Sequence, residues 1–310
     1  ELFEYAETFN DDIGDWDTST VTNMNKMFRG AYVFNQDVGD WDVAAVTDMD
    51  NMFNNAQDFS KAIGEWDVAK VTDMEDMFRE AYDFNQDIGN WDVSAVTTME
   101  KMFYRATAFD KNIGDWDVSV VKKIYAMFGK AFNFNQDIGN WDVGAVTNMK
   151  QMFQQAKSFN GDIGDWNVSA VTDMDRMFLD AHEFNKDIGN WDVTSVEDMS
   201  DMFNNAQVFN QDIGKWNVSA VTNMGAMFNN ASAFNQKVSE WDVAAVNKMD
   251  SMFMYADDFN QNLSNWCDDA STGYFANYSG CVDYKCGLDG DDEAACPSPS
   301  PSPSPSPSPS

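Results

Sequence analysis

The chain has 310 residues and carries 52 acidic against 19 basic side chains, which gives a formal net charge of −33. Because nucleic acids and anionic membranes bind to clustered Lys and Arg, this charge argues against both kinds of partner. The 11 Trp and 24 Phe residues exclude a disordered chain. No run approaches the roughly 20 apolar residues of a membrane-spanning helix, so direct membrane insertion is not expected. The sequence starts in mid-pattern at Glu1 without a signal peptide, which indicates a processed or partial chain.

Large aromatic residues recur at a fixed interval. Every Trp stands 25 residues from the next, from Trp16 to Trp266, and two Phe series that start at Phe3 and Phe9 keep the same interval. Residues 134–158 show the unit as F-N-Q-D-I-G-N-W-D-V-G-A-V-T-N-M-K-Q-M-F-Q-Q-A-K-S. An interval without insertions requires each unit to meet its neighbour in fixed register, which is typical of a solenoid. We predict about eleven stacked coils.

The apolar residues of the unit predict its elements in chain order. Trp141 and Val143 are two residues apart, as on one face of a strand, and Val146 begins a second short extended segment. The next apolar residues are spaced i, i+3, i+4 and i+7, as on one face of a helix: Met149, Met152, Phe153 and Ala156. The expected fold class is therefore an α/β repeat solenoid over residues 1–266, with short strands and a short helix in each coil. At roughly 4.8 Å per coil, the stack would form a rod about 50 Å long.

Polar residues also form columns at fixed positions of the unit. One column is Asn, from Asn10 to Asn260, and two are mostly Asp, starting at Asp12 and Asp17. Stacked Asn side chains bond turn backbones and one another, and an Asp in a turn accepts nearby backbone N–H bonds, so a structural role is expected for all three. Ca²⁺ held between the Asp columns is the alternative, because this cation prefers several carboxylate and carbonyl oxygens. No other cofactor is expected.

Catalytic patterns are missing from the repeats. A Ser–His–Asp or Cys–His arrangement would have to use His182, the single histidine, which stands at a position where other units carry Tyr, Phe, Thr or Asp. The unit also contains neither a glycine-rich phosphate loop nor a metal-ligand cluster of Cys and His. We therefore expect a protein that is not an enzyme.

One segment departs from the unit by gaining basic residues. The basic side chains of this segment are Lys101, Arg105, Lys111, Lys122, Lys123 and Lys130. Variation of a solvated surface is one interpretation. The other is a docking site for an acidic partner, such as another copy of this chain, with Lys111, Lys122, Lys123 and Lys130 as contact candidates.

The C-terminal region differs from the repeats. All four cysteines lie within residues 267–296: Cys267, Cys281, Cys286 and Cys296. An even number so closely spaced predicts a disulfide-bonded cap in an oxidising, extracytoplasmic setting, with three pairings open. Residues 297–310 alternate Pro and Ser and predict an extended polyproline II tail.

Several residues are candidates for covalent glycans. Five Asn begin an N-x-S sequon: Asn167, Asn217, Asn230, Asn262 and Asn277. The Pro-Ser tail provides O-glycosylation candidates: Pro297, Ser298, Pro299, Ser300, Pro301, Pro303, Pro305, Pro307 and Pro309.

The repeated W-D-V-S-x-V-T-x-M-x-x-M-F-x-x-A-x-x-F-N-x-D-I pattern resembles the BspA-type leucine-rich-repeat family, in its 25-residue branch found in mycoplasma surface lipoproteins and in algae. The resemblance covers residues 1–266 and implies a solenoid related to leucine-rich repeats, in cell-surface or secreted proteins that are in some cases adhesive. It implies no enzymatic activity. The segment around Cys267 resembles the cap of algal members, which implies Cys267–Cys281 and Cys286–Cys296 pairs. The tail resembles hydroxyproline-rich glycoproteins of green algae and plants.

Two functions follow as hypotheses. The leading one is an extracellular, glycosylated structural or adhesive protein of the cell surface, which in one version assembles head-to-tail with copies of itself into a filament. The alternative is a recognition module that binds a protein or glycan on one face of the solenoid.

Overall fold

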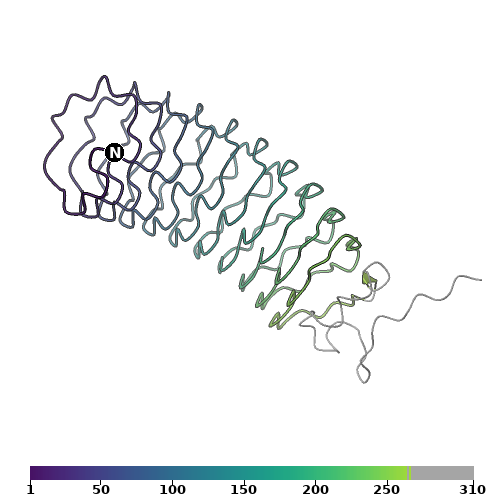
Figure 1. The fold of residues 1–310 in the computed structure, drawn as a ribbon. Coiled ribbons are helices and arrows are strands. Elements are labelled where there is room, and N and C mark those ends of the chain that lie inside the picture. Colours follow the sequence, from purple (N-terminus) through teal and green to yellow (C-terminus); the bar gives the residue numbers. More distant parts are fainter. Residues whose placement is uncertain (264, 267–310) are drawn as a thin grey trace, which may run out of the picture.

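The structure is a computed structural model that describes residues 1–263 and 265–266. The chain winds into coils that stack along one axis, from the purple N-terminal coils to the green coils near residue 260 (Figure 1). Nine isolated parallel bridges join equivalent residues of neighbouring coils in this part of the chain, from Asn23↔Asp48 to Asn223↔Lys248. The predicted solenoid of 25-residue coils in fixed register is therefore confirmed as an architecture.

The predicted helix is wrong. Residues 1–263 contain no α-helix, and the segment in question consists of consecutive β-turns. Met152 N–H donates to the Met149 carbonyl at 3.2 Å, and Ala156 N–H donates to the Phe153 carbonyl at 3.0 Å. The third residues of these two turns, Gln151 and Gln155, have φ angles of 58° and 57°. A type II turn requires a positive φ at this place, whereas a helix requires about −63°.

The apolar spacing has a different origin from a helix. Two four-residue turns follow each other, one from Met149 to Met152 and one from Phe153 to Ala156. Their first and last residues point into the coil, and this alone produces the i, i+3, i+4, i+7 spacing. The N–H groups of alternate residues bond the next coil: Gln151 N–H donates to the Asp175 carbonyl at 2.9 Å. Bonds between coils thus replace the bonds that a helix would form within itself.

The predicted strands are reduced to a single bridged residue in each coil. In the unit 134–158 this residue is Asn148, which bridges to Lys123 and Asp173. Val143 is followed by a turn, closed by Val146 N–H donating to the Val143 carbonyl at 2.9 Å. Trp141 N–H likewise closes a turn on the Ile138 carbonyl at 3.1 Å. Each coil is therefore a closed loop of turns, and α/β is not its secondary structure.

The interior is filled by stacked aromatic columns. Phe128 lies 3.9 Å from Phe134 of the same coil and 5.8 Å from Phe153 of the next, measured between ring centroids. Trp141 stacks on Trp166 at 6.5 Å, and its Nε1–H donates to the Ile113 carbonyl at 3.0 Å. Such stacking explains why a coil that could not bury its own rings requires a neighbour. The separations exceed the expected ~4.8 Å per coil, a spacing that applies to paired strands.

The Met residues are also part of the core, as predicted. Met149 and Met152 are fully buried, as are their equivalents in the neighbouring coils. At these places the flexible thioether side chain fills space between aromatic columns.

Candidate functional site

The constant polar columns have structural roles. Asn160 N–H donates to Asn135 Oδ1 at 2.8 Å, so the Asn column links one coil to the next. Gly139 N–H donates to Asp137 Oδ1 at 3.0 Å, and Gly144 N–H donates to Asp142 Oδ1 at 3.0 Å. The predicted capping of turn backbones is thus confirmed for all three columns.

A calcium ladder finds no support in these columns. Their carboxylate oxygens accept backbone N–H bonds, as the two Asp columns show. Within residues 1–263 and 265–266, no group of three or more His, Cys, Asp or Glu side chains has an arrangement that could hold a metal ion.

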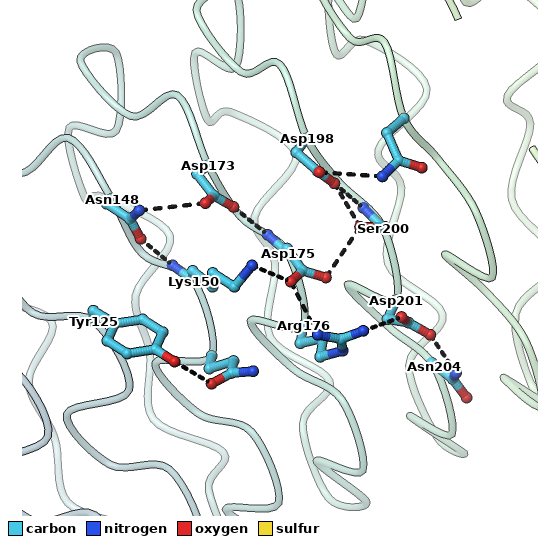
Figure 2. A network of polar contacts seen from close by, with 12 residues as sticks. Tyr125, Asn148, Lys150, Asp173, Asp175, Arg176, Asp198, Ser200, Asp201 and Asn204 are labelled. Atoms are coloured by element: carbon cyan, nitrogen blue, oxygen red, sulfur yellow. Dashed lines mark hydrogen bonds and ion pairs between the residues drawn. The ribbon is translucent and has the colours of Figure 1, made fainter. Parts of the chain in front are cut away.

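Six positions that vary from coil to coil lie close together in the turns of the unit, while others, such as those of Gln136 and Asn140, vary elsewhere. The term variable face is used below for the positions of residues 148, 150, 151, 154, 155 and 157 and their equivalents at intervals of 25. Contacts join these positions: Tyr125 Oη donates to Gln151 Oε1 at 2.8 Å, and His182 Nε2 lies 4.0 Å from Asp180 Oδ1. Figure 2 shows part of this face, with polar side chains of successive coils directed at one another.

Arginine and tyrosine occur only on this face within the described residues. All four Arg of the chain lie on it, at Arg29, Arg79, Arg105 and Arg176. All six Tyr of the described residues lie on it as well: Tyr5, Tyr32, Tyr82, Tyr104, Tyr125 and Tyr255. Neither residue type appears at a position that the repeat keeps constant.

One part of the variable face satisfies its own charges. Asp175, whose side chain is 5% exposed, lies 2.6 Å from Lys150 Nζ and 3.3 Å from Arg176 Nη1 (Figure 2). Ser200 Oγ donates to the other Asp175 oxygen at 3.0 Å, and Arg176 Nη2 lies 3.3 Å from Asp201. The hydrogen bond to Asp175 raises the pKa of Lys150. The four charged groups of Lys150, Asp175, Arg176 and Asp201 therefore pair with one another across neighbouring coils.

A second part gathers cations around two tyrosine rings. Arg79, Arg105 and Lys130 surround Tyr104, with their charged groups 5.6, 5.8 and 5.6 Å from the ring centroid. Lys101 Nζ lies 5.1 Å from the centroid of the Tyr125 ring. We call these six residues the Tyr104 cluster. Each contact is a cation–π interaction that leaves the cation able to bind an anion.

Gly129 explains why the Tyr104 ring lies across the next coil. A Cβ at Gly129 would stand 2.7 Å from Tyr104 Cδ2, a contact that no side chain tolerates without displacing the ring. A Cβ at Gly30 would likewise stand 2.8 Å from Tyr5 Cδ1. Each ring is thus paired with a glycine one coil later.

The carboxylates near the Tyr104 cluster balance it only in part. Glu80 Oε1 lies 3.2 Å from Arg105 Nη1, and Asp76 Oδ1 lies 3.6 Å from Arg79 Nη1. Among the described residues, no carboxylate lies within 4.0 Å of Lys101 Nζ or Lys130 Nζ. The cluster is therefore a local cationic surface on an acidic chain.

Acidic side chains cluster beside it. Burial raises the pKa of Asp50, Glu75 and Asp76, and neighbouring carboxylates add to the effect for each of them. For Glu75 the largest of these neighbours is Glu100. The variable face thus contains a cationic and an acidic region side by side.

The structure brings together only part of the predicted basic segment. Lys130 belongs to the Tyr104 cluster, whereas Lys123 is 61% exposed and lies 3.9 Å from Glu100. Lys122 is exposed, and its N–H donates to the Thr97 carbonyl. Lys111 stands in the column of Gln136, outside the variable face. The sequence interpretation missed Arg79 and did not join Tyr104, an aromatic residue at a variable position, to the basic segment. An alignment of the units beneath one another would have placed both beside Arg105.

A small hollow adjoins the Tyr104 cluster. It has a volume of about 150 Å³ and is lined by polar residues of four coils: Tyr5, Arg29, Gly30, Asn54, Asn55, Arg79 and Glu80. Arg79 borders both the hollow and the Tyr104 ring.

His182 Nε2 lies 4.0 Å from Asp180 Oδ1 and 3.3 Å from Asn205 Nδ2.

The predicted glycosylation sites have different surroundings. Asn167 and Asn217 are exposed, and each Oδ1 accepts the N–H of the residue two positions later at 3.2 Å. Asn230 is half-buried and donates through Nδ2 to Asn205 Oδ1 at 2.6 Å. Asn262 is exposed. The four cysteines, Asn277 and the Pro-Ser tail lie outside the described residues, so their predicted roles stay predictions.

No helix in the described part of the chain is long and apolar enough to cross a membrane.

These features define a repeat solenoid with a constant core and one variable face. A family model described as "Mycoplasma protein of unknown function, DUF285" matches residues 1–91, 38–138, 80–189 and 173–285. The chain therefore belongs to the DUF285 family.

The chain is also distantly similar to solved structures. A crystal structure of a TLR13–ssRNA13 complex is similar at 7% sequence identity and a TM-score of 0.31, over 77% of this chain and 41% of that one. This chain thus spans less than half of the length of that protein. No curated protein matches the chain.

Proposed function

We propose that the chain is a non-enzymatic recognition module that binds a macromolecular partner through its variable face. The confinement of Arg and Tyr to this face carries the proposal. Tyr and Arg are strongly enriched among the residues that dominate binding energy in protein interfaces. Solenoids also provide extended surfaces on which each coil contributes a few contact residues.

The residues at the constant positions already have structural roles. Trp, Phe and Met fill the core, while the Asn and Asp columns bond turn backbones. Changes at these positions would disturb the stack of coils and not a binding preference. Recognition of a particular partner therefore has to use the positions that differ from coil to coil.

A comparison of two variants on arrays of peptides and glycans tests the proposal. Tyr104→Gln introduces the residue type that position 154 carries, and Val120→Ala introduces the residue type of position 145, on a surface outside the variable face. We expect the Val120→Ala variant to bind the same array members as the wild type, and Tyr104→Gln to lose them. Retention of all members by Tyr104→Gln would overturn the proposal, provided that its melting temperature is unchanged.

We further propose that recognition takes place outside the cell, in an adhesive surface protein. This version rests on the resemblance to surface proteins, on the cysteine-rich region and on the exposed sequons at Asn167 and Asn217. Intact mass before and after enzymatic deglycosylation tests it. A mass equal to that of the bare polypeptide, with all thiols reduced, would contradict it.

The head-to-tail filament is a separate proposal. It is supported by the stacking of equivalent coils in fixed register, which copies of the chain could continue end to end. Electron microscopy of native material should then show fibres, and dispersed rods at high concentration would rule the filament out.

A further inference from the structure

We propose that the Tyr104 cluster is a docking site for an extended acidic segment of a protein partner. The proposal rests on the proposed recognition function and names the chemistry of the ligand. The carboxylates of this acidic segment would pair with Arg79, Arg105 and Lys130, while the backbone of the segment would cross the ring of Tyr104.

The cluster has an excess of positive charge. The cluster contains four cations, which contact two carboxylates, Asp76 and Glu80, within ion-pair distance. Lys101 and Lys130 contact tyrosine rings in place of carboxylates. The whole chain carries a net charge of −33, so this surface offers an anion a local attraction on a chain that is acidic overall.

The spacing of the coils is close to that of side chains on one face of an extended segment. Arg79, Arg105 and Lys130 come from three successive coils, and equivalent Phe rings beneath them are 5.7 Å apart. In an extended strand, side chains on one face repeat every ~6.7 Å, twice the rise per residue. Acidic residues at alternate positions of an extended segment therefore meet successive coils with a mismatch of about 1 Å per step, which long Arg and Lys side chains absorb.

Surrounding acidic groups make other polyanions less suitable. Glu75 and Glu100 stand at the same repeat position as Tyr125, and Glu80 lies 3.2 Å from Arg105. A long, densely charged nucleic acid or sulfated polysaccharide would extend over these carboxylates and be repelled. A short segment with one carboxylate per coil avoids them.

Fluorescence anisotropy with a labelled peptide of alternating Glu and Thr tests the proposal, with a Gln–Thr peptide as the uncharged control. The full chain is used at low ionic strength and in a salt series. The test variant is Lys101→Gln with Lys130→Gln, and the matched control is Lys61→Gln with Lys111→Gln. All four changes introduce Gln, which equivalent positions of other coils already carry, and both pairs change the net charge equally.

We expect the Glu–Thr peptide to bind the wild type and the control pair equally, with an affinity that falls as salt rises. The test pair should bind about tenfold more weakly, since Lys130 supplies a charge contact and Lys101 adds to the local positive charge. Glu80→Gln should bind more tightly than the wild type, because it removes a competing carboxylate. Equal binding by the test and control pairs would overturn the proposal.

Two further results would identify a different occupant and also overturn it. The first is a heparin-derived hexasaccharide that binds more tightly than the peptide and is lost in the test pair. The second is self-association of the chain in sedimentation that the test pair abolishes. If Tyr104→Gln loses its array members while the acidic peptide fails to bind the wild type, the recognition function stands and the acidic ligand does not.

Discussion

Among single residues of the variable face, some polar side-chain atoms have hydrogen-bond partners and others have none. In the described part of the chain, three buried side-chain polar atoms have no hydrogen-bond partner, and all belong to this face: Asp76 Oδ1, Arg79 Nε and Thr98 Oγ1. Leaving a buried polar group unpaired costs about 1–3 kcal/mol. The region of the Tyr104 cluster is therefore not optimised for stability, as is common at binding sites.

Thr98→Val tests this cost directly. Val has nearly the shape of Thr, so the variant should be more stable by about 1 kcal/mol in denaturant unfolding, because the unpaired hydroxyl is removed. The neighbouring Thr97 is the control, since its hydroxyl donates to the Thr72 carbonyl at 3.2 Å. Thr97→Val should not be stabilising. Equal effects of the two substitutions would show that Thr98 is satisfied in solution.

The buried acids predict a dependence of stability on pH. The pKa of Glu75 is raised in the folded state by burial and by neighbouring carboxylates, so the folded chain holds this proton to a higher pH than the unfolded chain. Its contribution to stability is therefore present at low pH and is lost as pH rises above about 4. Glu75→Gln should reduce the fall in melting temperature between pH 4 and 7. An unchanged pH profile would contradict the burial of this carboxylate.

Asp92 predicts the opposite dependence of stability on pH. Hydrogen bonds from the Ser94 hydroxyl and from the Ser94 backbone N–H lower its folded pKa. Its contribution is therefore present above its unfolded pKa and is lost as pH falls through the lowered value. Asp92→Asn, which Asn167 shows to be tolerated, should alter only the acid side of the profile.

At the scale of the element, the turns of each coil were not predictable from apolar spacing. Consecutive turns and a helix place apolar residues at the same intervals, as Met149 to Ala156 show. The left-handed positions that distinguish them are occupied by Gln151, Gln155 and other non-glycine residues, with Gly30 as an exception, so the usual glycine signal is too rare to reveal the turns. The solenoid itself, its register and its aromatic core were predictable, because the 25-residue interval permits few other arrangements.

Ala226→Gly distinguishes turns from helix. Ala226 has a φ of 52°, where a side chain is strained and glycine is not. The variant should be as stable as the wild type or up to about 1 kcal/mol more stable, whereas in a helix the same change costs about 1 kcal/mol. Ala244→Gly, in an ordinary turn, serves as the control and should be destabilising. Comparable losses in both variants would contradict the left-handed position.

At the scale of the whole molecule, the candidate site was only partly predictable. The basic segment of the sequence includes Lys130 and Arg105, which belong to the cluster, but also Lys111, which stands in another column. Arg79 was missed because it lies one coil before that segment. In a solenoid, residues at the same position of neighbouring units lie closer together than residues farther apart within one unit. Side chains that recur in a column are therefore a better indication of a site than side chains that are close in the sequence.

In the proposed function, binding depends on the variable face while the constant positions maintain the fold. A variant that replaces five cluster residues by those found 100 positions later in the same chain, where the coils fold with them, separates the two roles: Lys101→Asp, Tyr104→Asn, Arg105→Asn, Tyr125→Gly and Lys130→Asn. We expect an unchanged cooperative unfolding transition and loss of the peptides or glycans bound by the wild type on the arrays. A chain that folds and still binds the same array members would contradict it.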